Sequence, residues 1–209
     1  MVQRLSAKPG KIDLFAAETG FALAEIYTML SDRFDPLVSI RIKNEIERRI
    51  VEPYATKLNK LWWEKGTNNW AAVCVGSVGC TLMLLFPERF AELRDRIEAT
   101  MECYLSGFAD DGFCVEGSGY WHYGFGFFTV YADMVKKFTG GEGDYFTRPK
   151  VRAVATYIQK MFLSGHTSVS FADSGTSLSY HLGLVHYLKS VYPNDIAVYD
   201  RSFSYNYDN

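Results

Sequence analysis

The chain has 209 residues, of which 48% are apolar and 22% charged, a composition that suits a globular protein with a sizeable core and excludes a disordered one. The formal net charge is −2, so there is no basic excess of the kind that indicates a nucleic-acid partner. No stretch reaches the roughly 18 consecutive apolar residues of a membrane span, and the first residues lack the apolar run of a signal peptide. We therefore expect a soluble chain.

Helical periodicity dominates the sequence, and strand-like alternation is scarce. Pro53 falls inside one of the expected helices and should end or kink it. Short extended pieces are predicted only at 112–115 and 167–172. The expected helices lie at about 12–34, 38–63, 71–85, 88–105, 123–138, 150–163 and 177–191.

A weak internal repeat accompanies these helices. The tripeptide Leu-Ser-Gly occurs at 105–107 and again at 163–165, and an irregular loop with an acid follows each copy, Glu116 in one and Asp173 in the other. Stacked helical hairpins would produce such a pattern. The sequence therefore predicts an all-α fold, an incomplete (α/α) toroid of antiparallel helical hairpins, formed by residues 1–209 as a single domain.

The cysteines Cys74, Cys80, Cys103 and Cys114 show no C-x-x-C spacing, and none is grouped with histidine as a zinc site requires. Buried free thiols are the prediction. His181 and His186 are five residues apart on an expected helix, which is poor spacing for a shared metal, so no metal site is predicted.

Three loops combine aromatic rings with Asn, Glu, Asp and His. They span 62–70, 110–124 and 166–180, and each joins two expected helices. Flat rings stack on the apolar face of a sugar, and the polar groups bind its hydroxyls. In a toroid of hairpins such loops gather at one end, which predicts a carbohydrate site there.

The loop motifs resemble a known family. Asn68-Asn69-Trp70, then Asp111-Gly112, Glu116-Gly117 and the run Gly-Tyr-Trp-His-Tyr-Gly at 119–124 are similar to the catalytic domain of the heparinase II/III-like polysaccharide lyases. The resemblance covers about residues 55 to 190. In that family the helical toroid normally precedes a large β-sandwich region, so the resemblance implies a chain truncated before such a region.

The resemblance implies β-elimination on an acidic, uronic-acid-containing polysaccharide. A neutral donor must stabilise the charge that builds on the uronate carboxylate, and an acid–base group must move the protons. By motif, Asn69 resembles the carboxylate neutraliser and Tyr123 the catalytic tyrosine. Neither a metal nor an organic cofactor is required for this chemistry. The residues expected to contact substrate are Asn68, Trp70, Glu116, Tyr120, Trp121, His122 and Asp173.

Trp70 stands where several members of the family have a histidine, and it can stack on a sugar but cannot act as a base. The family's histidine farther downstream has no assigned counterpart in this chain.

Purely structural roles are the alternatives for these residues. Asn69 could cap the helix expected near residue 71, and Tyr123 could be a core residue. Glu116 could orient its loop by binding backbone amides, and Asp173 with Ser174 could begin a helix.

Two other functions stay open. One is a glycoside hydrolase that uses Glu116 and Asp173 as its acid and base. The other is a carbohydrate-binding domain without catalysis, in which Trp70 and the loop aromatics bind the sugar. Detection of an unsaturated uronate product separates the lyase from both.

Overall fold

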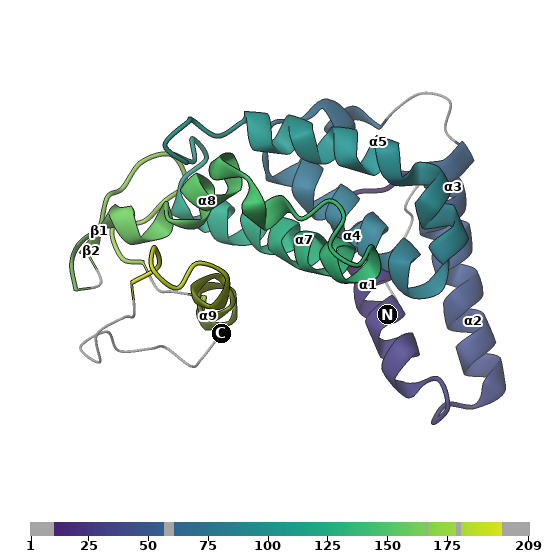
Figure 1. The fold of residues 1–209 in the computed structure, drawn as a ribbon. Coiled ribbons are helices and arrows are strands. Elements are labelled where there is room, and N and C mark those ends of the chain that lie inside the picture. Colours follow the sequence, from purple (N-terminus) through teal and green to yellow (C-terminus); the bar gives the residue numbers. More distant parts are fainter. Residues whose placement is uncertain (1–10, 57–60, 166, 179–180, 198–209) are drawn as a thin grey trace. The chain divides into compact units, whose positions relative to one another are not determined.

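The computed structural model describes residues 11–56, 61–165, 167–178 and 181–197. Over these ranges the chain is mostly helical, and the sheet they contain has two strands, so the all-α prediction is confirmed (Figure 1). None of the helices in this part of the chain is both long and apolar enough to cross a bilayer.

The described residues fall into two compact units. The first contains 11–56, 61–66 and 70–103, and the second contains 67–69 together with the described residues from 104 onward. The expectation of a single domain stays a prediction. The helices of the first unit are α1 (Leu14–Leu30), α2 (Pro36–Ile46), α3 (Glu52–Thr56), α4 (Asn69–Leu85) and α5 (Pro87–Ser106). The first residue of α4 and the last three residues of α5 belong to the second unit.

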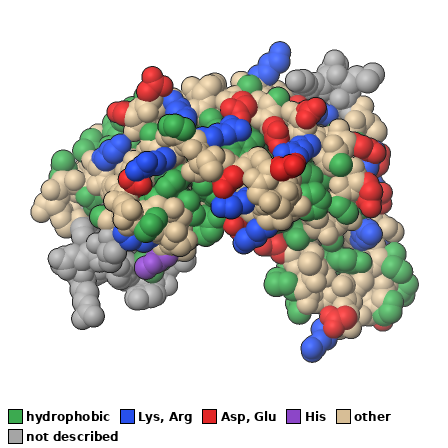
Figure 2. Space-filling model, in the orientation of Figure 1, with side chains coloured by type: hydrophobic (Ala, Val, Ile, Leu, Met, Phe, Trp, Pro, Cys, Tyr) green, Lys and Arg blue, Asp and Glu red, His purple; other side chains and the backbone are tan. Residues whose placement is uncertain are grey.

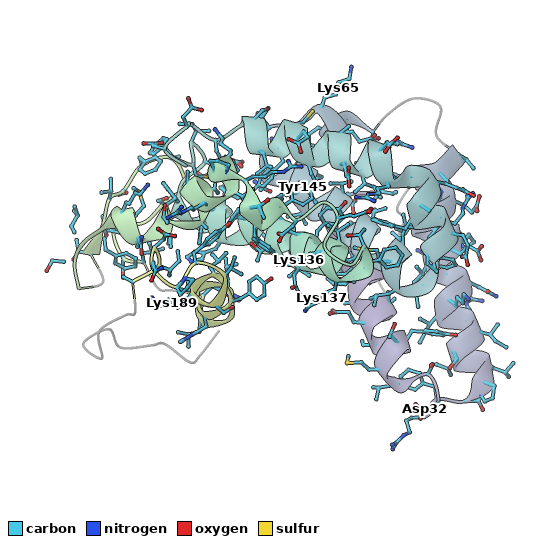
Figure 3. All side chains as sticks on the ribbon, in the orientation of Figure 1. Asp32, Lys65, Lys136, Lys137, Tyr145 and Lys189 are labelled. Atoms are coloured by element: carbon cyan, nitrogen blue, oxygen red, sulfur yellow. The ribbon has the colours of Figure 1, made fainter. Side chains whose placement is uncertain are left out.

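Helices α1 and α2 form a hairpin whose ends follow from local capping. The Asp13 carboxylate accepts a hydrogen bond from the Ala16 amide, and the Asp35 carboxylate accepts one from the Leu37 amide. Pro36 opens α2 at a position where a helix needs no backbone donor. Asp32 marks the turn between the two helices (Figure 3). The expected first helix is therefore shorter than predicted at its C-terminal end.

The expected second helix is not continuous. A π turn, η1 (Glu47–Val51), separates α2 from α3. Pro53 has no amide hydrogen to bond the carbonyl four residues earlier, and its ring crowds that carbonyl, so the helix widens just before it. A separate 3-10 turn, η2 (Trp62–Lys65), follows nearer the end of the predicted range.

A buried ion pair organises the core of the first unit. Glu64 accepts hydrogen bonds from Arg96 on both carboxylate oxygens, at 2.8 and 2.7 Å, and its side chain is only 1% exposed. The Arg96 guanidinium also donates to the Tyr54 carbonyl at 2.6 Å and lies over the Tyr54 ring. The Trp63 ring lies parallel to the Tyr54 ring, with their centroids 6.3 Å apart, and its indole N–H donates to the Ile12 carbonyl. Every charge in the cluster therefore has a partner, as burial requires.

The hairpin α1–α2 also carries apolar side chains that face solvent. Met29 is 66% exposed, Leu37 76% and Ile40 56%. In the space-filling view, apolar atoms gather over this hairpin (Figure 2). These residues contribute little to the core of the first unit.

The second unit is built from short helices and irregular segments. Its elements are α6 (Ser118–Tyr120), the π turn η3 (Trp121–Phe125), α7 (Gly126–Phe138), the 3-10 turn η4 (Tyr145–Thr147), α8 (Pro149–Ala155), the 3-10 turn η5 (Ile158–Met161), β1 (Phe162–Ser164), β2 (Thr167–Ser168) and α9 (Leu182–Val191).

Helix α7 buries one face and exposes the other. Phe128, Tyr131, Ala132 and Val135 are all fully buried, at the three- and four-residue spacing that places them on one side. The last turn carries Lys136 and Lys137, which lie near the negative end of the helix (Figure 3). The expected fifth helix is confirmed from residue 126 onward.

Two expectations for the C-terminal part are wrong. The helix predicted over 150–163 ends at Ala155, continues as η5, and then becomes strand β1, which pairs antiparallel with β2. The helix expected from residue 177 begins only at Leu182, and residues 179–180 lie outside the described part of the chain.

The Leu-Ser-Gly repeat is also not structural. Its first copy ends α5, whereas Leu163 and Ser164 of its second copy belong to β1. Gly165 then turns the chain with a φ of 54°. The same three letters thus serve a helix end and a hairpin turn, because neighbouring residues decide their conformation.

Candidate functional site

The centre of the candidate site is a two-point contact between Asn69 and Glu116, both in the second unit. The Asn69 backbone N–H donates to Glu116 Oε2 at 2.8 Å, and its side-chain Nδ2 donates to Glu116 Oε1 at 2.9 Å. The two residues are 47 positions apart in the chain. Asn69 is the first residue of α4 and is only 4% exposed.

This contact changes the structural interpretation of both residues. The first amides of a helix have no partner within it, and a carboxylate near them is stabilised by the helix dipole. Glu116 occupies that position for α4, while the Asn69 carboxamide binds Glu116 through Nδ2. The Asn69 Oδ1 atom is buried and has no hydrogen-bond partner among the described residues.

Glu116 is placed by the loop that precedes it. Cys114 forms an isolated antiparallel bridge with Phe108, and the Gly117 N–H donates to the Cys114 carbonyl at 3.2 Å. Two lysines support the loop from α8 and η5, since Lys150 Nζ donates to the Phe108 and Ala109 carbonyls and Lys160 Nζ to that of Asp111. Of the extended piece expected at 112–115, only Cys114 forms a β-bridge, and Gly112 turns the chain with a φ of 88°.

The loop that follows residue 166 is joined to this one through Ser174. Its Oγ accepts hydrogen bonds from the Ser118 N–H at 2.7 Å and from the Ser118 hydroxyl at 3.0 Å. Gly117 has a φ of 94°, and a Cβ there would lie 2.2 Å from Ser174 Oγ. Only glycine therefore fits between Glu116 and Ser118, both sterically and in backbone conformation.

Tyr123 lies on the π turn η3, next to the Asn69 contact. A Cβ on its neighbour Gly124 would lie 3.0 Å from Asn69 Cβ and 2.9 Å from the Tyr104 hydroxyl. The backbone of Tyr123 is one residue from this close approach, so Asn69 and Tyr123 are spatial neighbours. The Tyr123 ring is partly exposed and packs edge-on against Phe127. Single-turn π segments occur often at functional sites.

His122 connects η3 to the start of α9. Its Nε2 accepts a long hydrogen bond, 3.5 Å, from the His181 backbone N–H. Burial and the nearby His181 ring lower the pKa of His122 to about 4, and a hydrogen bond to the Ser118 carbonyl opposes this shift. The ring is therefore neutral at physiological pH.

Trp121 does not line the site. It is fully buried, its indole N–H donates to the Val154 carbonyl at 2.9 Å, and its ring stacks on Phe125. The expectation that it contacts substrate is wrong for this structure, because the ring has no exposed face. Tyr120, one residue earlier, is 37% exposed. The two rings point differently because successive side chains on a helical turn are rotated by about 100° about its axis.

Asn68 and Trp70 flank the central asparagine and are partly exposed. Trp70 belongs to the first unit, where its ring packs at 4.9 Å from Trp62, which is 60% exposed. Asp173 is exposed, in a turn between β2 and α9. The expectation that Asp173 and Ser174 begin a helix is wrong, because Ser174 is instead a buried hydrogen-bond partner of Ser118.

The sequence-based prediction of the site does not include Tyr104, and Gly124 enters it only as the last residue of the run at 119–124. The Tyr104 hydroxyl is buried beside Gly124, and burial first, then Cys114 and Glu116, raises the pKa of this phenol well above its usual value. Tyr104 follows the helical spacing of α5 and therefore resembles any core residue. The glycine at position 124 is the sequence signal that fits a close approach of backbone at this point.

The four cysteines are free, as predicted, and three of them are buried. No group of histidine, cysteine and acidic side chains in the described ranges is arranged to hold a metal ion. No protein-family model matches the chain, and no curated protein matches it significantly.

Proposed function

We propose that this chain is the helical catalytic part of a polysaccharide lyase that cleaves a uronic-acid-containing polymer by β-elimination. The proposal includes the finer fold, an incomplete (α/α) toroid of antiparallel helical hairpins. One observation carries it: Glu116 fixes the Asn69 carboxamide beside the π turn that bears Tyr123. The motif resemblance assigns the neutraliser and the acid–base group to these two residues.

Their chemistry suits the two tasks of the reaction. The Asn69 Nδ2 atom carries two hydrogens, and Glu116 accepts one of them; in the proposed complex the second would donate to a uronate carboxylate that reaches this residue, which is 4% exposed in the free chain. A neutral donor there stabilises the charge that develops as the adjacent carbon loses its proton. Tyr123 would remove that proton and return one to the leaving glycosidic oxygen. This sequence of steps needs no metal or organic cofactor.

Further side chains would bind the acidic polysaccharide around this pair. We assign Tyr120, His122 and Asn68 to that role because each is at least partly exposed and close in sequence to Asn69 or Tyr123. Asp173, also exposed, belongs to the same assignment. Trp70 with Trp62 offers an aromatic face of the kind on which sugars stack.

The hydrolase alternative is less well supported. A glycosidase needs one carboxyl group to give up a proton and another to activate water or attack. Both oxygens of Glu116 already accept hydrogen bonds from Asn69 and are committed to the start of α4. The binding-domain alternative is supported by the exposed Trp62 beside Trp70 and needs no catalytic pair.

Incubation of the purified chain with several uronate polymers tests the proposal. β-Elimination creates a carbon–carbon double bond conjugated to the carboxylate, which is followed by its ultraviolet absorbance. New reducing ends without that absorbance would indicate a hydrolase. Binding of a polymer with neither signal would indicate a carbohydrate-binding domain. Either outcome would overturn the lyase proposal.

A further inference from the structure

Glu116 holds the Asn69 carboxamide in one orientation. The backbone N–H and Nδ2 of Asn69 reach different oxygens of the same carboxylate, at 2.8 and 2.9 Å, so the contact closes a ring that includes the side chain. A flipped amide would place Oδ1 against Oε1, acceptor against acceptor. One flip of the amide is therefore strongly preferred.

The carboxylate that makes this contact is itself held firmly. Gly117, directly after it, adopts a positive φ and abuts Ser174, and Ser118 donates two hydrogen bonds to the same serine. Glu116 thus reaches Asn69 from a loop fixed at both ends. On the other side, Gly124 packs against Asn69 Cα and Cβ and limits where the side chain can go.

We propose that Glu116 is the positioning residue for Asn69: it acts on the reaction only through the orientation of the Asn69 amide and does not contact substrate itself. This inference rests on the proposed lyase function and replaces the substrate-contact role that the motif suggested for Glu116. The carboxylate also strengthens the arrangement, because hydrogen bonds to an ionised acceptor are shorter and stronger than neutral ones.

An exchange of the two groups tests the contact directly. In Glu116→Gln one of the two donors of Asn69 faces an amide N–H, and in Asn69→Asp two carboxylates face each other. In the double variant, the glutamine amide donates to the new aspartate and its oxygen accepts the backbone N–H, so both contacts return. We expect each single variant to lower the urea midpoint of unfolding and the double variant to recover most of the loss. No recovery would overturn the contact.

Activity then separates positioning from stability. We expect Glu116→Gln to lower kcat on a uronate polymer about 10- to 100-fold, the size of effect that a small misplacement of a catalytic group produces, with KM nearly unchanged. The double variant should stay inactive although it is stable, because aspartate offers no N–H. Glu98→Gln is the matched control, since it makes the same carboxylate-to-amide change in a pair with Arg94 that involves neither Asn69 nor its loop, and it should keep kcat.

The two proposals can fail separately. If the wild-type chain eliminates none of the uronate polymers, the proposed function is overturned, and with it the catalytic role of Glu116, whatever the unfolding data show. If the wild type is active and folded Glu116→Gln keeps its kcat, the lyase function stands and the positioning role is wrong.

Discussion

Ser174 and Ser118 are 56 residues apart in the chain, yet the Ser174 hydroxyl oxygen accepts hydrogen bonds from both the amide and the hydroxyl of Ser118. Both residues are buried. The backbone of Ser174 is held by its own loop. The Ser174 N–H donates to the Phe171 carbonyl, and the Ser170 hydroxyl donates to the Ser174 carbonyl. The contact joins two loops that carry proposed site residues.

Gly117→Ala should destabilise the protein by at least about 2 kcal/mol. The residue has a φ of 94° and a ψ of 175°, a region that side chains other than glycine strain to adopt. The new methyl group would also lie 2.2 Å from Ser174 Oγ. Gly119→Ala is the control in the same motif, because a Cβ there meets no atom within 4 Å. Urea unfolding of the two variants should separate them clearly; equal stability would contradict the conformation described for Gly117.

Tyr123→Phe should reduce β-elimination about 100- to 10,000-fold, the usual contribution of a general acid–base group. Phenylalanine keeps the ring and its edge-on contact with Phe127, so unfolding should change little. Initial rates of double-bond formation measure the effect. Tyr120→Phe is the matched comparison on the neighbouring, more exposed tyrosine and should retain most of the rate. The opposite pattern would assign the chemistry to Tyr120, and two active variants would refute the tyrosine mechanism.

Glu64→Ala should cost about 3 kcal/mol or more, because removing one partner of a buried ion pair leaves the other charge uncompensated. Arg96 would lose both carboxylate bonds while its side chain stays only 17% exposed. Glu98→Ala provides the comparison: it breaks the half-exposed pair with Arg94 and should cost well under about 1 kcal/mol. Chemical unfolding of both variants checks the contrast, and similar losses would show that burial does not matter here.

His122 should make stability depend on pH between 6.5 and about 4. Burial, then the His181 ring, lowers its pKa from 6.5 to about 4 in the folded chain. Within this window the unfolded chain binds a proton that the folded chain does not, so stability falls as the pH falls. At about 1.4 kcal/mol per pKa unit, the loss attributable to this group across the window should be about 3 kcal/mol.

Unfolding free energies of the wild type and His122→Gln at both ends of that window measure the effect. The variant should lose less stability on acidification than the wild type. His186→Gln, which changes an exposed histidine on α9, should follow the wild-type curve. Parallel curves for wild type and His122→Gln would show that the His122 ring titrates normally.

The helices with a clear apolar face were predictable from sequence. Phe90, Ile97, Met101 and Tyr104 follow the three- and four-residue spacing of α5, and all are buried. The segments predicted wrongly depend on contacts made later in the chain. Residues 156–163 have a helical apolar pattern, but residues 162–164 pair with 167–168 as strands β1 and β2. The apolar spacing within one segment gives no information about such a pairing with a later segment.

The sequence motifs predicted which residues belong to the site but not how they contact one another. Asn69 and Glu116 each stood out by their neighbours, but nothing in the sequence indicates that one carboxylate would bind both donors of that asparagine. For Trp121 the motif predicted a substrate contact that the structure does not contain. An aromatic residue in a glycine-rich run resembles a sugar platform, and only the Val154 carbonyl and the Phe125 ring place it in the core.

The short stretch 67–69 clusters with residues 104 and beyond, while its chain neighbours on both sides cluster with the first unit. The second unit is therefore not a contiguous stretch of sequence. A gene segment encoding residues 104–209 alone would lack the asparagine whose two donors Glu116 binds, and a chain nicked between α4 and α5 would carry Asn69 and Glu116 on separate pieces. Any exchange of this unit between proteins would therefore have to carry residues 67–69 with it.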